Sequence, residues 1–313
     1  MSDDLFAGVD CGATKIMIQS GFLSSDSNRI IPGPIHQEYH YSDHPDWNDH
    51  YEPVPIDIQR SEYASENILL KDEEIKQGNV IINTIVESIA DIDGHRIGLC
   101  FPGIKDGHGV TVMANGPRMP YLNDRINKID TILNDSDCCV LGEWKSTIGK
   151  MQNMDNGVYI GGGTGIADGI IVDGDLIDLN NVNGLPRSWE ININSQETVE
   201  SCLSPAGMIR RYNKTNRSKI KTLIDLSNEK AFNEIIEKAL DAFSLLMKNR
   251  MQFFEMRGKT IQGIVIGHRL GQFLKNSDST FKDAFQKRTK IPINLSSDRR
   301  TAALGAAMAI ACS

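Results

Sequence analysis

The sequence lacks a long apolar run. Its longest, residues 302–312, is too short and too rich in small residues to span a bilayer. A basic segment followed by an apolar one, the mark of a secretory signal, is also missing, because residues 1–4 are acidic. We therefore expect a soluble, cytoplasmic protein without a membrane partner.

Positive charge is scarce as well. The chain has 33 lysines and arginines against 41 aspartates and glutamates, a formal net charge of −8. A nucleic-acid-binding surface normally presents a basic face, so no nucleic-acid partner is expected. A small anionic substrate would need local positive groups rather than a global field.

Cysteine pairing patterns are absent too. The six cysteines form no Cys-x-x-Cys pair and no regular spacing, so neither a disulfide framework nor a zinc site is predicted. Most of these cysteines should be small buried residues that stay reduced.

Two glycine-threonine turns about 150 residues apart are the most informative feature present. Residues 8–15 and 161–169 each join a short apolar run to another, as a tight hairpin does. Small residues let backbone N–H groups approach an anion closely. One such turn alone would favour a plain hairpin. Two in the same context favour nucleotide phosphate binding, with Asp10 beside the phosphates holding Mg²⁺, usually through water.

Periodicity predicts strands alternating with helices, hence an α/β protein with mixed sheets and two related halves. At 313 residues, the chain is long enough for two domains. Residues 30–66, with four histidines and five prolines, are expected to be an irregular surface excursion rather than a metal site. The expected helices are 72–91, 121–133, one starting within 144–151, several within 197–257, 270–274 and one from 301; the expected strands include 96–101, 138–141, 261–266 and 292–295.

These motifs resemble those of the ROK family of sugar kinases, within the group that includes hexokinase, actin and the Hsp70 nucleotide domain. The resemblance covers nearly the whole chain. The motifs are the first phosphate turn at 8–15, a Pro-Gly segment at 98–103, a sugar-contacting asparagine loop at 114–117, the second phosphate turn at 163–166, an adenosine turn at 265–267 and a closing helix at 303–307.

The resemblance implies a two-domain, actin-like (ribonuclease H-like) fold with a cleft between the domains, ATP and Mg²⁺ as cofactors, and a possible homodimer. The expected domains are a smaller one at 1–115, joined by the C-terminal helix at about 298–313, and a larger one at 116–297. The implied nucleotide-binding residues are Asp10, Gly12, Thr14, Lys15, Gly163, Thr164, Gly165 and Gly267. The implied acceptor-binding residues include Asn115 and Glu200.

The first departure from the family pattern concerns the catalytic base. The family has Asn-Asp after a strand, and its aspartate takes the proton from the attacking hydroxyl. Here Gly142-Glu143 follows the expected strand 138–141, so we predict Glu143 as the base. The alternative is a solvated glutamate favoured by a helix N-terminus.

The second departure removes the family's zinc segment. Residues 185–190 replace its Gly-His motif, and the cysteine-rich loop is absent, so no zinc site is expected. We predict that Glu190 contacts the acceptor and that Trp189 offers an apolar platform for a ring face; local packing for Trp189 and a solvated carboxylate for Glu190 are the alternatives. A third departure, the 30–66 insert, could serve as a substrate lid or a dimer contact.

The resulting hypothesis is an ATP- and Mg²⁺-dependent kinase that phosphorylates a hydroxyl of a monosaccharide or a sugar-like cyclitol by in-line transfer of the γ-phosphate. Loss of the zinc segment resembles the branch acting on cyclitols and modified sugars; a glucokinase or an N-acetylhexosamine kinase is the alternative. A catalytically silent nucleotide- and sugar-binding sensor is the alternative of another class. The family's repressors carry an N-terminal helix-turn-helix, which we do not expect where the phosphate turn begins by residue 8.

Overall fold

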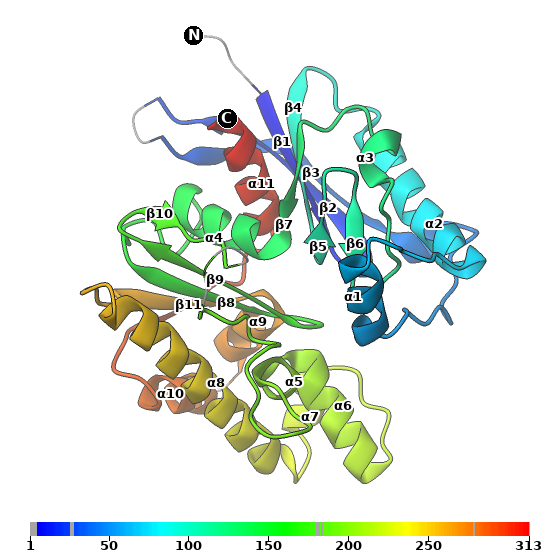
Figure 1. Cartoon of the computed structure of the whole chain (residues 1–313). Helices are drawn as coiled ribbons and strands as arrows, with labels where there is room; N and C mark the ends of the chain where they lie inside the picture. The colour runs from blue at the N-terminus through cyan, green and yellow to red at the C-terminus, as the bar shows by residue number, and fades with distance from the viewer. Residues whose placement is uncertain (1–4, 26–27, 180–181, 183, 278, 313) are drawn as a thin grey trace. The chain divides into compact units, whose positions relative to one another are not determined.

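The structure is a computed structural model that describes residues 5–25, 28–179, 182, 184–277 and 279–312 (Figure 1). The chain divides into two compact units, one of Met1–Ile148 with Arg300–Ser313 and one of Gly149–Arg299. The domain boundary expected at 115/116 therefore falls inside the first unit. The reason is that residues beyond 116 still supply a strand and a helix to that unit's sheet.

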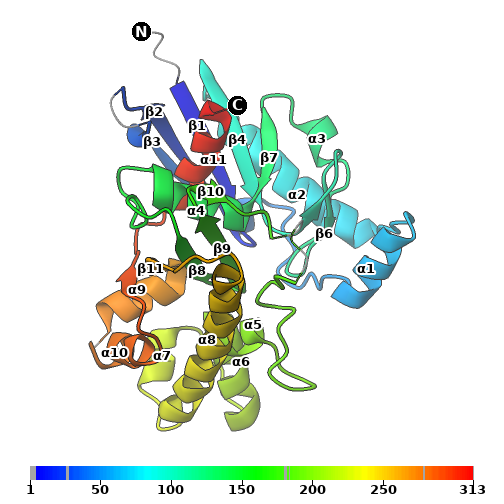
Figure 2. The ribbon, with the colours of Figure 1, turned by 60° about the vertical axis from the view of Figure 1, so that its left-hand side comes forward.

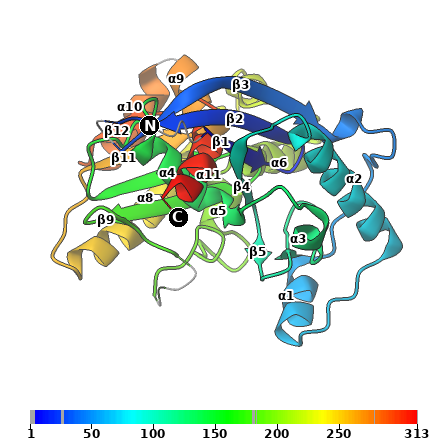
Figure 3. The ribbon, with the colours of Figure 1, turned by 90° about the horizontal axis from the view of Figure 1, so that it is seen from above.

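The first unit is built on a mixed sheet with the order β3-β2-β1-β4-β7 (Figure 3). β1 pairs in parallel with β4, and β4 with β7, whereas β2 and β3 are antiparallel additions. These strands are β1 (Leu5–Cys11), β2 (Lys15–Leu23), β3 (Ile30–His40), β4 (His95–Phe101) and β7 (Thr131–Asn134). The hairpin of β5 (Ile104–Lys105) and β6 (Val110–Val112) turns through Asp106-Gly107 as predicted.

The helices of this unit confirm part of the sequence prediction. The helix expected at 72–91 is α2 (Asp72–Ile89), and the helix expected from 301 is α11 (Thr301–Ala311). The 30–66 segment is more regular than expected, because its first part is the long strand β3. The remaining elements are η1 (Tyr41–Asp43), α1 (Ile56–Ala64), α3 (Leu122–Arg125) and α4 (Asp135–Lys145).

Residues 121–151 are where the sequence prediction was wrong. The helix expected at 121–133 ends after the single turn of α3, and β7 follows. The strand expected at 138–141 and the helix expected within 144–151 are replaced by α4, which ends at Lys145. The Cys138–Leu141 run is short and apolar, and such a run fits a buried strand or a buried helix equally well. The pairing of Ile132 with Leu99 makes the preceding segment the strand.

α11 packs on β1 and β4 on one side and on α4 on the other. The approach is so close that a Cβ on Gly8 would lie 1.6 Å from the Ala303 carbonyl oxygen, and one on Gly305 would lie 1.8 Å from that of Cys138. Glycine at these positions is therefore required for backbone-to-backbone contact. This explains why the closing helix is composed of small residues.

The Gly305→Ala variant is expected to lose about 3 kcal/mol of unfolding free energy, because overpacking a close helix contact forces the backbones apart. Urea unfolding followed by circular dichroism measures this loss. Gly107→Ala is the matched control, since a Cβ at Gly107 meets no atom within 4 Å, and its change should stay within about 0.5 kcal/mol. Equal stability of the two variants would contradict the close-packing account.

The second unit repeats this sheet, with the order β10-β9-β8-β11-β12 (Figure 2). Again the central strand pairs antiparallel on one side and parallel on the other. The strands are β8 (Gly157–Gly162), β9 (Ile166–Val172), β10 (Asp175–Leu176), β11 (Gly263–Gly267) and β12 (Ile293–Leu295). The shared strand order is the structural form of the two related halves predicted from the sequence.

The helices of the second unit agree with prediction in part: the 197–257 region is helical and the helix expected at 270–274 forms, whereas the helix at Ser279–Lys287 was not predicted. The apolar sides of the long helix α8 and of its neighbours form one core with β8 and β11. They are α5 (Val199–Leu203), α6 (Pro205–Asn216), α7 (Leu223–Ser227), α8 (Phe232–Glu255), α9 (His268–Asn276) and α10 (Ser279–Lys287). Within the ranges that the structure describes, no helix is both long enough and apolar enough to cross a membrane.

Candidate functional site

The carboxyl ends of β1, β4 and β7 meet at one edge of the first sheet. The register places Asp10 beside Cys100 and Phe101 beside Asn134. The Cys100 thiol donates to Asp10 Oδ1 at 3.4 Å. Asp10 therefore lies at the end of its strand, as predicted, and chemistry in open α/β sheets gathers at such ends.

Asp135 follows β7 at this same edge and opens α4. It is half-buried, and one of its carboxylate oxygens accepts from the Ser136 N–H at 2.8 Å. Asn134 is the last residue of β7 and Asp135 is the first of α4, so this Asn-Asp pair at a strand end resembles the arrangement from which the family's base was inferred. Sequence reasoning missed it, although the apolar residues just before it were a usable signal.

The structure places Glu143 elsewhere. It lies inside α4 and is 1 % exposed. Eight residues separate it from Asp135, which corresponds to roughly 12 Å along the helix at 1.5 Å per residue. The premise that Glu143 directly follows a strand is therefore wrong, because the strand ends at Asn134.

Lys105 brings a cation to this edge, which the sequence analysis did not anticipate. Its Nζ donates to the carbonyl oxygens of Phe101 at 2.6 Å and Gly103 at 2.8 Å. Burial lowers the pKa of Lys105 below the ordinary lysine value, while the nearby Asp135 carboxylate acts in the opposite direction. This sheet edge therefore carries two carboxylates, of Asp10 and Asp135, and the amine of Lys105.

The first phosphate turn forms as expected between β1 and β2. The Gly12 N–H donates to the Lys15 carbonyl at 2.9 Å, and a Cβ on Gly12 would meet only that oxygen, at 3.6 Å. Thr14 is exposed at the turn. The ammonium of Lys15 is paired with Glu38 of β3 at 2.8 Å. A phosphate contact by Lys15 would have to compete with that pair.

The second unit gathers its predicted residues at the end of β8. The Gly163 N–H donates to the Gly165 carbonyl at 2.9 Å, which closes the turn around Thr164. Glu200 Oε2 accepts from the Ile166 N–H at 3.0 Å, just after the turn. Gly267 of β11 pairs with Gly161 of β8. The second phosphate turn, the adenosine turn and Glu200 are thus neighbours.

Glu190 has fewer contacts with this group of residues than Glu200 has. The Glu190 carboxylate is exposed and accepts from the Arg187 N–H at 3.0 Å within a local turn. Two residues before Glu190, the Ser188 carbonyl accepts from the backbone N–H of Glu200 at 3.2 Å. The 186–190 segment therefore contacts the backbone of Glu200.

A buried ion pair that sequence reasoning missed supports this segment. Arg250 of α8 pairs with Asp168 of β9, and their side chains are 0 % and 2 % exposed. Asp168 also accepts from the Ser188 N–H at 3.2 Å, and Arg250 donates to the Pro186 carbonyl at 2.8 Å. The pair ties the segment that precedes Glu190 to the sheet beside the phosphate turn.

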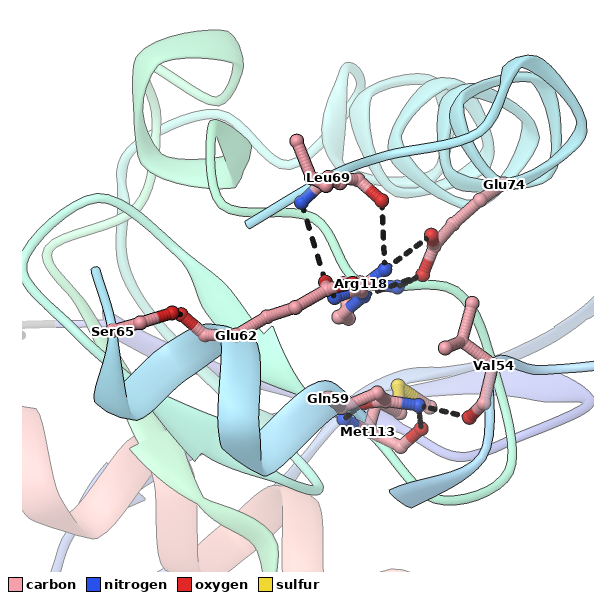
Figure 4. Close-up of polar contacts among 8 residues, drawn as sticks. All are labelled: Val54, Gln59, Glu62, Ser65, Leu69, Glu74, Met113 and Arg118. Atoms are coloured by element: carbon pink, nitrogen blue, oxygen red, sulfur yellow. Dashed lines mark hydrogen bonds and ion pairs between the residues drawn. The ribbon is translucent and has the colours of Figure 1, made fainter. Parts of the chain in front are cut away.

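Asn115 lies exposed in the turn 114–117 that follows β6. Arg118, fully buried, ends this turn (Figure 4). Its guanidinium donates to both carboxylate oxygens of Glu74 at 2.8 Å, to Glu62, and to the Leu69 carbonyl at 3.2 Å. Two carboxylates therefore share one arginine.

This sharing predicts an acid-sensitive contact. Its hydrogen bond to Arg118 lowers the pKa of Glu62 in the folded protein. A lowered folded pKa stabilises the protein above the usual glutamate value of about 4.3, and this stabilisation is lost as pH falls through the lower folded pKa. The melting temperature of Glu62→Gln should therefore lie below wild type at neutral pH and converge with it in acid.

Thermal unfolding from neutral pH down into the acid range measures this convergence. Glu87→Gln is the control, because Glu87 is exposed on α2 and should show no pH-dependent difference from wild type. A gap for Glu62→Gln that persisted at the lowest pH would contradict the ion-pair account.

Histidine, cysteine and carboxylate side chains do not assemble into any group of three or more suited to a metal in the portion of the chain that is described. Of the six cysteines, Cys312 is exposed and the other five are buried.

Comparison with known proteins gives the fold its context. No protein-family model matches the chain, and no curated protein matches it. Solved structures do: a ROK hexokinase from Thermus thermophilus superimposes with a TM-score of 0.62 at 15 % identity, over 97 % of each chain. The chain has the fold of the ROK sugar kinases.

Other structures with this fold have different roles. A ROK family glucokinase from Streptomyces griseus, in complex with glucose and AMPPNP, matches with a TM-score of 0.57 at 17 % identity, over 97 % of this chain and 98 % of that one. A ROK family transcriptional regulator, a homologue of the E. coli MLC protein, matches with a TM-score of 0.62 at 13 % identity, over 98 % of this chain and 78 % of that one. At these identities the likeness concerns the fold, which is the one predicted.

Proposed function

We propose that the protein is an ATP-dependent kinase that transfers a phosphoryl group to a hydroxyl of a sugar or sugar-like alcohol. The observation that carries this proposal is the position of Asp135, directly after β7 and at the same sheet edge as Asp10. The fold is shared with a hexokinase and with a glucokinase that binds glucose and AMPPNP.

Asp135 is the proposed general base. It would take the proton from the attacking hydroxyl, and its half-buried place at a strand end leaves the carboxylate within reach of a small substrate. Lys105, beside it, would balance negative charge at this edge. This assignment replaces Glu143 in the mechanism.

Asp10 is the proposed magnesium residue. A single carboxylate at a strand end fits an ion that keeps several waters and shares its remaining contacts with substrate phosphates. Bound there, Mg²⁺ would neutralise charge on the transferring phosphoryl group. The Cys100 thiol, which donates to Asp10, fixes the direction of the carboxylate.

The two glycine turns are the proposed phosphate-binding elements. Gly12 and Thr14 in the first unit, and Gly163, Thr164 and Gly165 in the second, would form the binding turns. The Gly12 and Gly163 N–H groups close these turns, so the other backbone N–H groups and the threonine hydroxyls would be the phosphate donors, while Gly267 would face the adenosine. Lys15 would contribute if its pair with Glu38 opened.

Asn115, Glu200 and Glu190 are the proposed acceptor-binding residues. Glu200 is the better supported of the two glutamates as an acceptor-binding residue, because it contacts the end of the second phosphate turn, whereas Glu190 closes an exposed local turn. A monosaccharide or a cyclitol is the proposed acceptor class, with a glucokinase or an N-acetylhexosamine kinase as variants of it.

A catalytically silent sensor is the second candidate, since a transcriptional regulator shares the fold. The sequence allows a sensor because the strand expected at 138–141 is followed by Glu143 and not by the family's usual aspartate. Asp135 at the strand end would supply that aspartate, which favours the kinase.

The deciding experiment incubates purified protein with ATP and Mg²⁺ against hexoses, amino sugars, N-acetyl sugars and C7 cyclitols, and detects ADP release and the mass of the product. A phosphorylated product from one acceptor class supports the kinase and assigns its pocket. Binding of nucleotide and sugar with no product from any acceptor would favour the sensor.

A further inference from the structure

The turn that carries Asn115 is held at its first end by Gln59 of α1, whose side chain is fully buried (Figure 4). The Met113 N–H donates to Gln59 Oε1 at 2.7 Å, and Gln59 Nε2 donates back to the Met113 carbonyl at 3.0 Å. Gln59 Nε2 also donates to the Val54 carbonyl at 2.7 Å. One side chain thus occupies both backbone groups of the residue where the turn begins.

Arg118 holds the other end. Its backbone N–H donates to Glu74 Oε1 at 3.0 Å, and its guanidinium binds Glu74 of α2 and Glu62 of α1. Both ends of the turn are therefore fixed by buried side-chain contacts, and only Ala114 and Asn115 are exposed between them.

The helix that supplies Gln59 and Glu62 belongs to the 30–66 insert, for which the sequence suggested a lid or a dimer contact. The polar contacts of this helix indicate another role, because they connect the insert to the turn that carries Asn115. Gln59 and Met113 are 54 residues apart, and Glu62 and Arg118 are 56. Buried backbone groups must be hydrogen-bonded, and removing the Gln59 side chain leaves three backbone groups, the Met113 N–H and the Met113 and Val54 carbonyls, without this partner.

We infer that Gln59 and Arg118 are positioning residues for Asn115, and that α1 is the scaffold through which the insert supports acceptor binding. The inference rests on the proposed function, because it assigns Asn115 to the acceptor. A polar group held in its binding geometry before the substrate arrives loses less conformational freedom on binding. Loosening the turn should therefore weaken acceptor binding and leave nucleotide binding unchanged.

The Gln59→Met variant tests this, since methionine keeps the length of the side chain and removes its hydrogen bonds. We expect the KM for the acceptor to rise about tenfold, the loss of one to two net hydrogen bonds, with the KM for ATP unchanged. Hydrogen–deuterium exchange of the Met113 and Arg118 amides should accelerate.

Gln77→Met is the matched control. Gln77 of α2 makes the same double contact with the backbone of Asn48, at 3.2 and 3.3 Å, on another part of the insert. It should leave the acceptor KM and the exchange of Met113 unchanged. An equal rise of the acceptor KM in both variants would mean that general loosening of the insert is responsible, and would overturn the inference.

A double-mutant cycle separates positioning from packing. If Gln59 acts through Asn115, then Gln59→Met adds no further rise of acceptor KM to an Asn115→Ala protein. Additive effects would overturn the inference. Should Gln59→Met fail to fold, Glu62→Gln is the second variant, because Glu62 is half-exposed and its loss weakens only the Arg118 end of the turn. It should raise the acceptor KM by a smaller factor. In an Asn115→Ala protein, Glu62→Gln should cause no further rise of the acceptor KM.

Failure of the proposed function has a different signature. If wild-type protein phosphorylates no acceptor, the kinase proposal falls, and the assignment of Asn115 to the acceptor falls with it. Amide exchange still decides the positioning: it is supported if Gln59→Met accelerates exchange at Met113 and Gln77→Met does not, and it is refuted if the two variants exchange alike.

Discussion

The Asp135→Asn variant is expected to turn over its acceptor about a thousandfold more slowly than wild type, within the range that a positioned general base contributes. Asparagine keeps the shape of the side chain and removes its basicity. ATP affinity should remain near normal, since Asp135 would act on the acceptor hydroxyl. Steady-state kinetics with the best acceptor, together with calorimetric titration of nucleotide, measures both quantities.

Glu143→Gln is the matched control, an equally conservative change in the same helix. Its carboxylate lies two turns farther along α4 and is buried, so turnover should stay within a few-fold of wild type. The opposite result, with Glu143→Gln inactive and Asp135→Asn active, would return the base to Glu143.

The Arg250→Met variant is expected to lose about 3–5 kcal/mol of unfolding free energy, the usual effect of breaking a buried ion pair from one side. The loss arises because Asp168 is left buried without its ion-pair partner. Chemical unfolding of the whole chain gives the value. The segment 186–190 should loosen as well, because Arg250 and Asp168 hold it.

Two controls sharpen this test. Lys259→Met breaks the exposed pair with Asp173, whose atoms are 2.8 Å apart, and should change stability by less than about 1 kcal/mol. The double variant Asp168→Leu with Arg250→Met should recover part of the loss, since it leaves no unpaired charge. The free energies of unfolding of Arg250→Met, Asp168→Leu and the double variant are then compared. If the double variant lost as much stability as the two single variants added together, the electrostatic explanation would be wrong.

The sequence predicted the parts of the fold that depend on local pattern. The two glycine turns, α2, β4 and α11 all have a periodicity or a turn signal within a short window. The helix α4 does not, because the Cys138–Leu141 run is equally compatible with a buried strand. Its identity depends on Ile132 pairing with Leu99, more than thirty residues away.

This one error led the sequence analysis to Glu143, and not to Asp135, as the acid that follows a strand. Because the strand was assigned to the wrong apolar run, the prediction of the base rested on a residue inside a helix. The contacts that hold the Asn115 turn were beyond reach for a similar reason: Gln59 and Met113 come together only through the packing of α1, and no spacing in the sequence announces it.

The chain returns at its end to the unit with which it began, because α11 packs on β1, β4 and α4. During synthesis on the ribosome, the second unit is therefore complete in sequence before the first one is. Until residues 300–312 emerge, Gly8 and Gly305 cannot make their close contacts, and the face of β1 and β4 that α11 covers stays open. β1 can pair with β2 and β4 as soon as those strands are made, but the packing of the first unit is completed only after residues 149–299 have been synthesised.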